Sequence, residues 1–531
     1  MSSPKSVASP ARASTGSPQA ATALGWFSVR RSHIWAALPI AFAFCYAASI
    51  PIKHSDLFYT LLNGRLMVDF GLFPLRVDPF TYAPVVPDFV NQPWLAQLLF
   101  LAADRLAGEA GVIFAHAVAI TSAFAVLNWL LRRQGASAPV AAGLTLLGLL
   151  LASTSFNVRP QSFSFLLFVA YLALIRLPLP ARLARPGIGI VAMIWANLHG
   201  SFTLMAPIAI AHTLGAILQY RDLRARCVRD VLWLSLITAG ASLLNPFGFS
   251  VWTYAVGVGA DPTNRQNIEE WAPVSPATLT GQLFLFTVPL IVLGLAAAWR
   301  WRARRFGWRM GVPIADVLLL MSLFGLALSM QRAVVWFGLA AVVALGGPPP
   351  EASRGRQHRH SDNTQPEIPA LNLAVLVAIG GLMLLSLPWF RSVNPLVAPE
   401  LRGLLSADHP TGAVAYLSEH LPPVQAGQAP PRLFARMEWG GYLAWELWPR
   451  VQVFSDARVE HHPPAVWREY FGILAARPGW QAQLDAYGAD WLLVERQPFP
   501  DLVAAAEADP RWRRVFADDL GVLYARATPG A

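Results

Sequence analysis

Residues 93–133 read PWLAQLLFLAADRLAGEAGVIFAHAVAITSAFAVLNWLLRR, and the way this stretch divides decides the fold. Its second part, 110–131, is a continuous apolar run, and about 20 such residues are enough to cross the hydrocarbon core of a bilayer. Its first part, 93–108, is also apolar, but it is shorter and carries Asp104 and Arg105. The sequence therefore predicts a membrane span over 110–131, and the rest of the chain must decide the status of 93–108.

The composition of the whole chain is typical of a protein with many spans. Of its 531 residues, 55% are hydrophobic and 14% are charged, whereas a soluble protein has about 25% charged residues. Basic cytoplasmic loops account for the net charge of +10, so we expect no nucleic-acid partner. The eleven runs that we predict to be spans are 34–52, 110–131, 138–155, 162–177, 186–198, 201–219, 228–244, 281–299, 313–330, 332–346 and 370–388.

The positions of the arginines decide the status of 93–108. If this segment does not cross the membrane, the N-terminus and the arginine-rich loops are all cytoplasmic. If it crosses, these loops fall outside, against the preference for Lys and Arg on the cytoplasmic side. We therefore predict that 93–108 is interfacial or re-entrant, in a multi-pass protein of a bacterial cytoplasmic (inner) membrane. The loops in question are 132–133, 176–185, 221–229, 300–309 and 354–359.

This topology divides the chain into three parts. Residues 1–30, rich in Ser, Ala and Pro, are predicted to be a disordered cytoplasmic tail. Residues 31–394 are predicted to form the transmembrane domain, with an outer loop at 53–109 that carries interfacial helices and a flexible cytoplasmic linker at 347–368. Residues 395–531 are predicted to form a small soluble α/β domain outside the cytoplasm, because helix and strand patterns alternate there. Strands are expected at 432–437, 451–456, 491–495 and 522–526, and helices at 413–420, 465–476, 480–487 and 501–508.

Two carboxylates of the first outer loop are candidate catalytic groups. Asp56 follows the first span, and a carboxylate there could accept a proton from an acceptor hydroxyl beside a lipid headgroup. The alternative for Asp56 is a solvated interfacial charge. Asp78 is the second candidate, and since it precedes Pro79 it could equally cap a turn.

Polar residues between later spans are candidate substrate ligands on the same outer face. Arg159, in the Arg159-Pro160-Gln161 motif, has a planar fork suited to phosphate, and Arg332 at the outer end of a span could act in the same way. His199 lies between two apolar runs, at a depth where ionisable groups usually face a cavity. The alternatives are an arginine that extends to the membrane interface and a histidine whose bonds are all structural.

Further candidates lie in a later loop and in the C-terminal part. Glu269 and Glu270 could bind an acceptor or a divalent cation, but adjacent helical residues do not share a face, so we expect a solvated loop with one buried member. Asp456 and Arg458 would share a face at the end of a predicted strand, where they could reach a sugar or each other. The pair Gly440-Gly441 predicts a backbone turn or a close approach.

Ten short motifs follow one another along the chain: Asp56, Gly64, Asp78-Pro-Phe-Thr81, Trp94-Leu95, Arg159-Pro-Gln161, Asn197-Leu-His-Gly200, Asn245-Pro-Phe-Gly248, Glu270-Trp271, Gly440-Gly-Tyr-Leu443 and Asp456-Ala-Arg458. In this order they resemble the GT-C-type polytopic glycosyltransferases, and more closely a bacterial branch related to the protein mannosyltransferases and the lipid A aminoarabinose transferases. The resemblance covers about residues 34–527. It implies a GT-C-like α-helical bundle of about eleven spans. It also implies transfer of a sugar from a polyprenyl-phosphate donor to an envelope glycan, lipid or protein, with Asp56 as the base; Asp78 stays the second candidate catalytic residue.

The chain departs from the pattern of this branch at three points. Asp56 has no acidic neighbour, Gln92-Pro93 stands where the branch usually has His-Glu, and Ala457 replaces a glycine. The first two leave a requirement for a divalent cation open, and no metal-ligand set is predicted. Three alternatives to a transferase also stay open: a transporter or flippase for lipid-linked glycans, a polymerase or ligase of surface polysaccharide, and an inactive scaffold.

Overall fold

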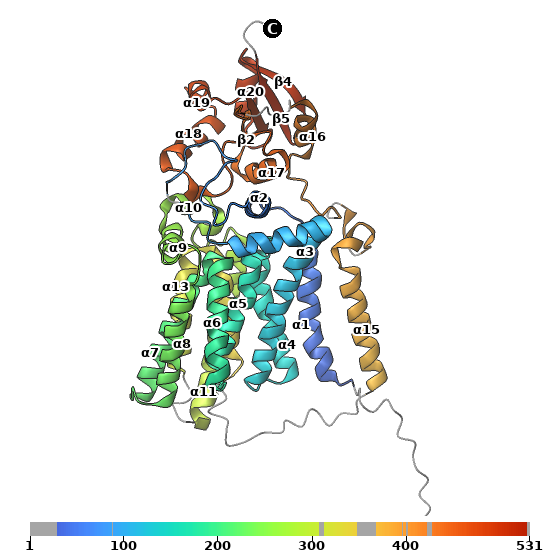
Figure 1. The fold of residues 1–531 in the computed structure, drawn as a ribbon. Helices are drawn as coiled ribbons and strands as arrows, with labels where there is room; N and C mark the ends of the chain where they lie inside the picture. Colours follow the sequence, from blue (N-terminus) through green and yellow to red (C-terminus); the bar gives the residue numbers. More distant parts are fainter. Residues whose placement is uncertain are drawn as a thin grey trace, which may run out of the picture.

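A computed structural model of the chain describes residues 29–87, 89–306, 313–347, 368–395, 397–399, 402–421 and 427–527. Of the predicted tail and the predicted linker, only residues 29, 30, 347 and 368 lie within these ranges. The described residues form a lower layer of long helices and an upper region that contains a sheet (Figure 1).

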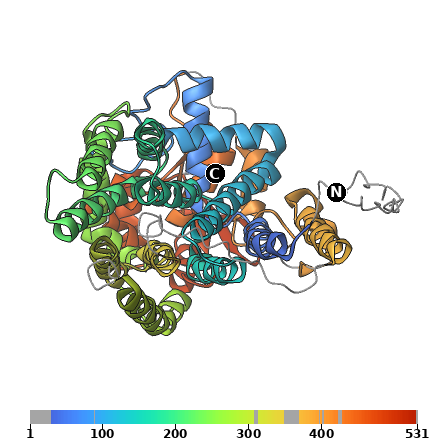
Figure 2. The same cartoon turned by 90° about the horizontal axis from the view of Figure 1, so that it is seen from below.

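The lower layer is a bundle of apolar helices, which Figure 2 shows from below. Each of the eleven predicted apolar runs overlaps one of these helices. Among the described residues, four helical stretches are long and apolar enough to cross a membrane: Trp94–Arg133, Ala138–Ser155, Gly200–Tyr220 and Leu279–Arg304. The chain is therefore a membrane protein, and the count of about eleven spans stays a prediction. The helices are α1 (Arg31–Ala48), α3 (Trp94–Arg133), α4 (Ala138–Ala152), α5 (Gln161–Arg176), α6 (Ala181–Leu198), α7 (Met205–Tyr220), α8 (Arg226–Ser242), α11 (Leu279–Phe306), α13 (Ile314–Ser329), α14 (Val334–Leu345) and α15 (Pro369–Leu385).

Helix α3 is broken at the place where the sequence predicts its division. Ala107 (φ −154°) and Gly108 (φ 59°, ψ −152°) leave helical geometry, and the backbone conformation of Gly108 is accessible almost only to glycine. The segment before the break lies across the upper ends of other helices, and the segment after it runs down through the bundle (Figure 1). The predicted division is thus confirmed, while a position at the membrane surface stays a prediction.

Helix α2 (Ser55–Asp69), which carries Asp56, lies between the two regions. It packs on the first segment of α3 and on helix α17 (Met437–Leu447) of the upper region. A Cβ atom on Gly64 would lie 2.8 Å from the backbone oxygen of Gln97, so a side chain at this position would push α2 away from α3. The glycine therefore sets the height of α2, and with it the position of Asp56, above the bundle.

The upper region is built on a five-stranded mixed sheet with the strand order β2-β1-β3-β5-β4. Strand β1 (Arg432–Phe434) is parallel to β2 (Gln452–Val453) and to β3 (Trp491–Glu495), whereas β5 (Gly521–Arg526) is antiparallel to β3 and to β4 (Trp512–Ala517). The mixture of helices and strands agrees with the predicted α/β character, and the domain boundary at 395 stays a prediction. The other helices are α16 (Thr411–His420), α18 (Pro464–Leu474), α19 (Trp480–Tyr487) and α20 (Pro500–Ala508).

Two of the predicted strands are too long, and one strand of the observed sheet was not predicted. Strand β1 ends at Phe434 and β2 at Val453, so Asp456 lies in the loop after β2 and shares no strand face with Arg458. Strand β4 has no predicted counterpart, because its exposed side chains, such as that of Arg513, interrupt the alternation of apolar and polar residues expected of a strand.

The two adjacent glycines lie inside α17, so the predicted turn is wrong and the predicted close approach is confirmed. A Cβ atom on Gly440 would lie 1.9 Å from the backbone oxygen of Ser455, and one on Gly441 would lie 2.6 Å from that of Ser55. The backbone N–H of Gly441 donates to the Ser55 hydroxyl at 3.1 Å. Helix α17 is therefore in direct backbone contact with the start of α2.

The loop after α2 extends the sheet of the upper region. The N–H of Val453 donates to the carbonyl of Phe80 at 2.9 Å, and the N–H of Tyr82 donates to the carbonyl of Val453 at 3.0 Å. Thr81 thus forms a parallel bridge to Val453. Because β2 is an edge strand, the loop occupies its free edge and joins the two regions.

Candidate active site

A cavity of about 1350 Å³ lies where the upper ends of the bundle helices meet the upper region. Its walls come from α2, the loop before α5, α9 (Ser250–Ala260) and α10 (Pro262–Asn267). Four short 3-10 helices complete it: η2 (Gly200–Leu204), η3 (Glu269–Trp271), η4 (Gln331–Ala333) and η8 (Val459–His461). Seven of the nine predicted site residues line this cavity: Asp56, Arg159, Gln161, His199, Glu270, Arg332 and Arg458.

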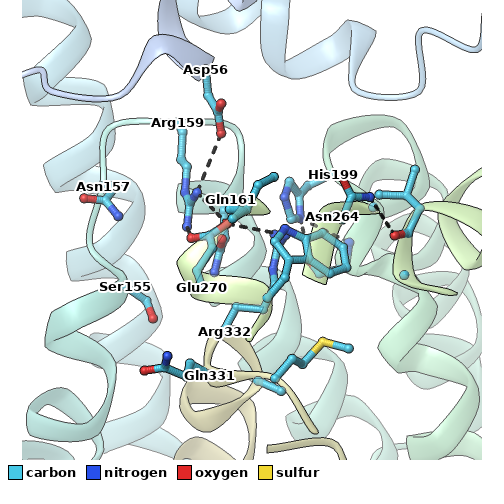
Figure 3. A pocket seen from close by; sticks show the side chains of 18 of the residues that line it. Asp56, Ser155, Asn157, Arg159, Gln161, His199, Asn264, Glu270, Gln331 and Arg332 are labelled. Atoms are coloured by element: carbon cyan, nitrogen blue, oxygen red, sulfur yellow. Dashed lines mark hydrogen bonds and ion pairs between the residues drawn. The ribbon is translucent and has the colours of Figure 1, made fainter. Parts of the chain in front are cut away.

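Four of these residues form a connected group, here called the ion quartet: Asp56, Arg159, Glu270 and Arg332 (Figure 3). Arg159 donates from both terminal nitrogens to Glu270, at 3.1 and 2.7 Å. Asp56 Oδ2 lies 3.6 Å from Nη1 of Arg159, and Arg332 Nη1 lies 3.4 Å from Oε1 of Glu270. Two carboxylates and two guanidinium groups therefore balance each other in one wall of the cavity.

Burial and charge act in opposite directions on the central pair of the quartet. Burial by itself would lower the pKa of Arg159, but the attraction of Glu270 outweighs it and raises this pKa. Burial would likewise raise the pKa of Glu270, but Arg159 and Arg332 together hold it well below its usual range. Both groups are consequently charged at neutral pH. Glu270 is only partly buried, with 27% of its side chain exposed, and Glu269 is exposed, so this loop has no fully buried glutamate.

His199 presents a neutral ring to the cavity. The backbone N–H of Ser201 donates to Nδ1 of His199 at 3.1 Å, so Nδ1 carries no proton and Nε2 carries it. Burial, with the nearby Arg332 and Arg159, lowers the pKa of His199 well below its usual value. Among the described residues Nε2 has no hydrogen-bond partner, which leaves one N–H donor available to a ligand.

Asp78 and Asp456 lie away from the cavity, in a buried group that we call the loop–domain cluster together with Arg458 and His461. Asp78 Oδ2 lies 2.6 Å from Arg458 Nη2 and 2.9 Å from His461 Nε2. Asp456 accepts from Nε of Arg458 at 2.9 Å, so the predicted contact between these two residues is present. The side chains of the two aspartates are 1% and 0% exposed, which leaves no room for a substrate at either carboxylate.

The surroundings of Asp78 favour the turn-capping alternative. Its Oδ1 accepts from the backbone N–H groups of Phe80 and Thr81, at 3.1 and 3.2 Å. Burial would raise the pKa of Asp78, but the Arg458 guanidinium, His461 and Thr81 together outweigh it and hold this pKa well below its usual range. Asp78 thus fixes the loop after α2 and holds Arg458 where it reaches the cavity.

Sequence reasoning missed three side chains that line the same cavity: Tyr59, Tyr254 and Glu460. The hydroxyl of Tyr254 donates to Oε1 of Glu460 at 2.9 Å, across 206 residues of chain. The only available signal was for Tyr59, which follows Asp56 by one helical turn. Nothing in the local sequence of Tyr254 or Glu460 indicates that they meet.

The quartet does not have the donor set of a metal site. Among the described residues, no group of three or more His, Cys, Asp or Glu side chains is placed to hold a metal ion. The carboxylate beside Asp56 belongs to Glu270, and the guanidinium of Arg159 lies between the two. A cation at Asp56 would have to displace this guanidinium, so the residues present do not fit one.

Three solved structures resemble the chain over most of its length. Archaeal oligosaccharyltransferase AglB from Archaeoglobus fulgidus, in complex with an inhibitory peptide and a dolichol-phosphate, is 13% identical with a TM-score of 0.54, covering 94% of this chain and 75% of that chain. The Archaeoglobus fulgidus oligosaccharyltransferase in complex with Zn and sulfate is 13% identical with a TM-score of 0.52, covering 92% and 73%. The arabinofuranosyltransferase AftD from Mycobacteria is 15% identical with a TM-score of 0.53, covering 95% and 40%.

These similarities are structural only. No protein-family model matches the sequence, and no curated protein shows significant similarity to it. AglB and AftD are GT-C-type glycosyltransferases, and at this level of identity the likeness establishes the fold, which is the one that the motifs implied. The chain therefore has the GT-C-type fold of the polytopic membrane glycosyltransferases.

Proposed function

We propose that the protein is a glycosyltransferase that moves a sugar from a polyprenyl-phosphate donor to an acceptor at the outer face of a bacterial cytoplasmic membrane. The observation that carries this proposal is a cavity whose lining brings together a carboxylate, Asp56, two guanidinium groups and a neutral histidine. A phosphate leaving group and a hydroxyl nucleophile need these two kinds of partner. The dolichol-phosphate in the similar archaeal structure supports the same class of donor.

The proposed step is a single displacement at the anomeric carbon. The acceptor oxygen forms a bond to this carbon, and the bond from the carbon to the phosphate oxygen breaks with its electron pair. The electrons leave with the polyprenyl phosphate, and the acceptor proton passes to Asp56. Attack opposite to the leaving group inverts the configuration of the sugar.

The two arginines have different parts in this step. The side chain of Arg159 is 5% exposed and donates from both terminal nitrogens to Glu270, so it positions the two carboxylates. Arg332 is 19% exposed and makes one contact with Glu270, at 3.4 Å, and its guanidinium lies over the Trp271 ring at 4.2 Å. Its remaining N–H donors, together with Nε2–H of His199, are the groups that we propose to hold the leaving phosphate.

The proposal includes an orientation in the membrane, which the distribution of positive charge supports. With the cavity and residues 395–531 outside, the N-terminus and the arginines at the opposite end of α3 are cytoplasmic, as the distribution of positive charge requires. A topology reporter inserted after Arg133 should give a cytoplasmic signal. An external signal there would contradict both the orientation and the interfacial placement of 93–108.

The transferase proposal can be tested with the purified full chain. It is incubated with a panel of polyprenyl-phosphate monosaccharides and an envelope extract, and the release of polyprenyl phosphate is measured. We expect release by the wild type and a loss of about 10²-fold or more in Asp56→Asn, since general-base catalysis typically contributes 10²–10⁴-fold.

Asp69→Asn is the matched control, because Asp69 lies at the other end of α2 in an exposed pair with Arg105. No release by the wild type from any donor would contradict the proposed function. Equal release by Asp56→Asn and Asp69→Asn would contradict the role of the base. Movement of intact donor across a vesicle membrane without release would favour the transporter alternative.

A further inference from the structure

The cavity contains a second group of polar side chains that the proposed step does not use. We call it the roof site: Tyr59 of α2, Tyr254 of α9 and Glu460 of η8. These residues come from three elements that are far apart in the sequence. Helix α10 packs against both η3, which carries Glu270, and η8, which carries Glu460, so the roof site and the ion quartet are in neighbouring walls.

Glu460 is the central residue of the roof site. One of its oxygens, Oε1, accepts from the Tyr254 hydroxyl at 2.9 Å, and among the described residues it has no ion-pair partner. Burial raises the pKa of this carboxyl. Besides Tyr254, its backbone donor is its own N–H, and a carboxylate has more acceptor sites than these two donors fill, so it can accept further hydrogen bonds from a ligand.

Tyr59 connects the roof site to the base. It lies three residues after Asp56 on α2, and residues at this spacing are neighbours on a helix surface. The Arg458 guanidinium lies over its ring at 5.0 Å, which fixes the ring, and its hydroxyl has no hydrogen-bond partner among the described residues. A ligand bound between Glu460 and Tyr59 would therefore present its own groups to Asp56.

The size of the cavity leaves room for such a ligand beside the donor. Its volume is about 1350 Å³, whereas the pocket for one small ligand typically measures about 300–1000 Å³. A donor phosphate at Arg332 and His199, with its sugar next to Asp56, leaves the part of the cavity under η8 for the second substrate.

We propose that the roof site binds the acceptor and that this acceptor is a saccharide, an inference that rests on the proposed transferase function. The remaining acceptor sites of the Glu460 carboxyl and the Tyr59 hydroxyl, which has no partner among the described residues, suit a ligand with several adjacent O–H groups. The two tyrosine rings offer apolar faces to a sugar ring. An acceptor without hydroxyl groups at this point would leave the remaining acceptor sites of Glu460 unfilled.

The test uses the full chain with a radiolabelled polyprenyl-phosphate sugar and three acceptor pools prepared from the envelope of the source cells: polysaccharide, lipid extract and protein. We expect the label to enter the polysaccharide pool. In Glu460→Gln and in Tyr254→Phe the KM for this pool should rise about 10-fold, since losing one hydrogen bond to a charged group costs about this factor. The KM for the donor and the slow hydrolysis of the donor in the absence of acceptor should be unchanged.

Glu469→Gln is the matched control, because Glu469 accepts from the hydroxyl of Tyr487 elsewhere in the upper region and does not line the cavity. Label found only in the lipid or protein pool would overturn the saccharide assignment. A change in the donor KM instead of the acceptor KM would place Glu460 in the donor site and overturn the inference. No turnover of donor by the wild type would contradict the proposed function itself, which is a different result from turnover that Glu460→Gln leaves unaffected.

Discussion

Arg332 and Arg159 share one partner, Glu270, yet their replacement by glutamine should have different consequences for stability. Arg332 makes one ion contact, at 3.4 Å and with 19% of its side chain exposed. Such partly exposed pairs contribute about 0–1 kcal/mol to stability, and Glu270 keeps both bonds to Arg159 when Arg332 is lost. The folded state of Arg332→Gln should therefore be nearly as stable as that of the wild type.

The same substitution removes a donor aimed at the charge that develops on the leaving phosphate. Loss of one such donor typically lowers kcat by about 10²–10³-fold, or about 3–4 kcal/mol in the barrier. Arg159→Gln differs, because Arg159 is 5% exposed and its removal leaves Glu270 without its two strongest bonds. Breaking a buried pair in this way costs about 3–5 kcal/mol of folding free energy.

The two variants are compared by the initial rate of polyprenyl phosphate release at saturating donor and by the midpoint of thermal unfolding, followed by tryptophan fluorescence. Arg105→Gln, which removes an exposed arginine of α3, controls for loss of charge. We expect Arg332→Gln to lose rate but not stability, and Arg159→Gln to lose both. If Arg332→Gln turns over at the wild-type rate, or unfolds as early as Arg159→Gln, the division of roles between the two arginines is wrong.

Three further outcomes are expected. Asp78→Asn should destabilise the protein by about 3–5 kcal/mol, and equal unfolding midpoints of variant and wild type at neutral pH would contradict the buried contact. Because the native pKa of Asp78 is depressed, the greater stability of the wild type should be complete above about pH 4 and should shrink as the pH falls below it. Gly441→Ala should lower the midpoint of thermal unfolding, because the new Cβ would lie 2.6 Å from the backbone oxygen of Ser55 and overpacking costs about 1–3 kcal/mol. An unchanged midpoint would mean that α17 and α2 can move apart at no cost. Treatment with EDTA should leave the release of polyprenyl phosphate unchanged, because the Arg159 and Arg332 guanidinium groups already balance Asp56 and Glu270; a loss restored by Mg²⁺ or Mn²⁺ would refute this.

Features encoded in short stretches of sequence could be predicted. Each apolar run became a helix because hydropathy acts locally, and the break at Gly108 fell where the distribution of arginines required a division. The meeting of Arg159 with Glu270 was not predicted, although each residue was singled out alone, since the contact depends on how α5 and η3 pack. Local propensity also misled, because Gly440-Gly441 favours a turn unless tertiary contact requires small residues in a helix. The pair of Tyr254 and Glu460 shows the limit most clearly, since neither residue has a neighbour that marks it.

The loop–domain cluster also has a consequence for the order in which the chain is made. Asp78 and its partner Arg458 are 380 residues apart, and ribosomes add about 5–20 residues per second, so Asp78 waits about 20–80 s for its partner during synthesis. In that interval the loop after α2 lacks the edge of β2, and helix α2 lacks α17. A chain that stops before the upper region is complete would insert its apolar helices but leave Asp56 on an uncovered helix. The residues that close the cavity from above, such as Arg458 and Glu460, leave the ribosome long after Asp56, so the site forms late in synthesis.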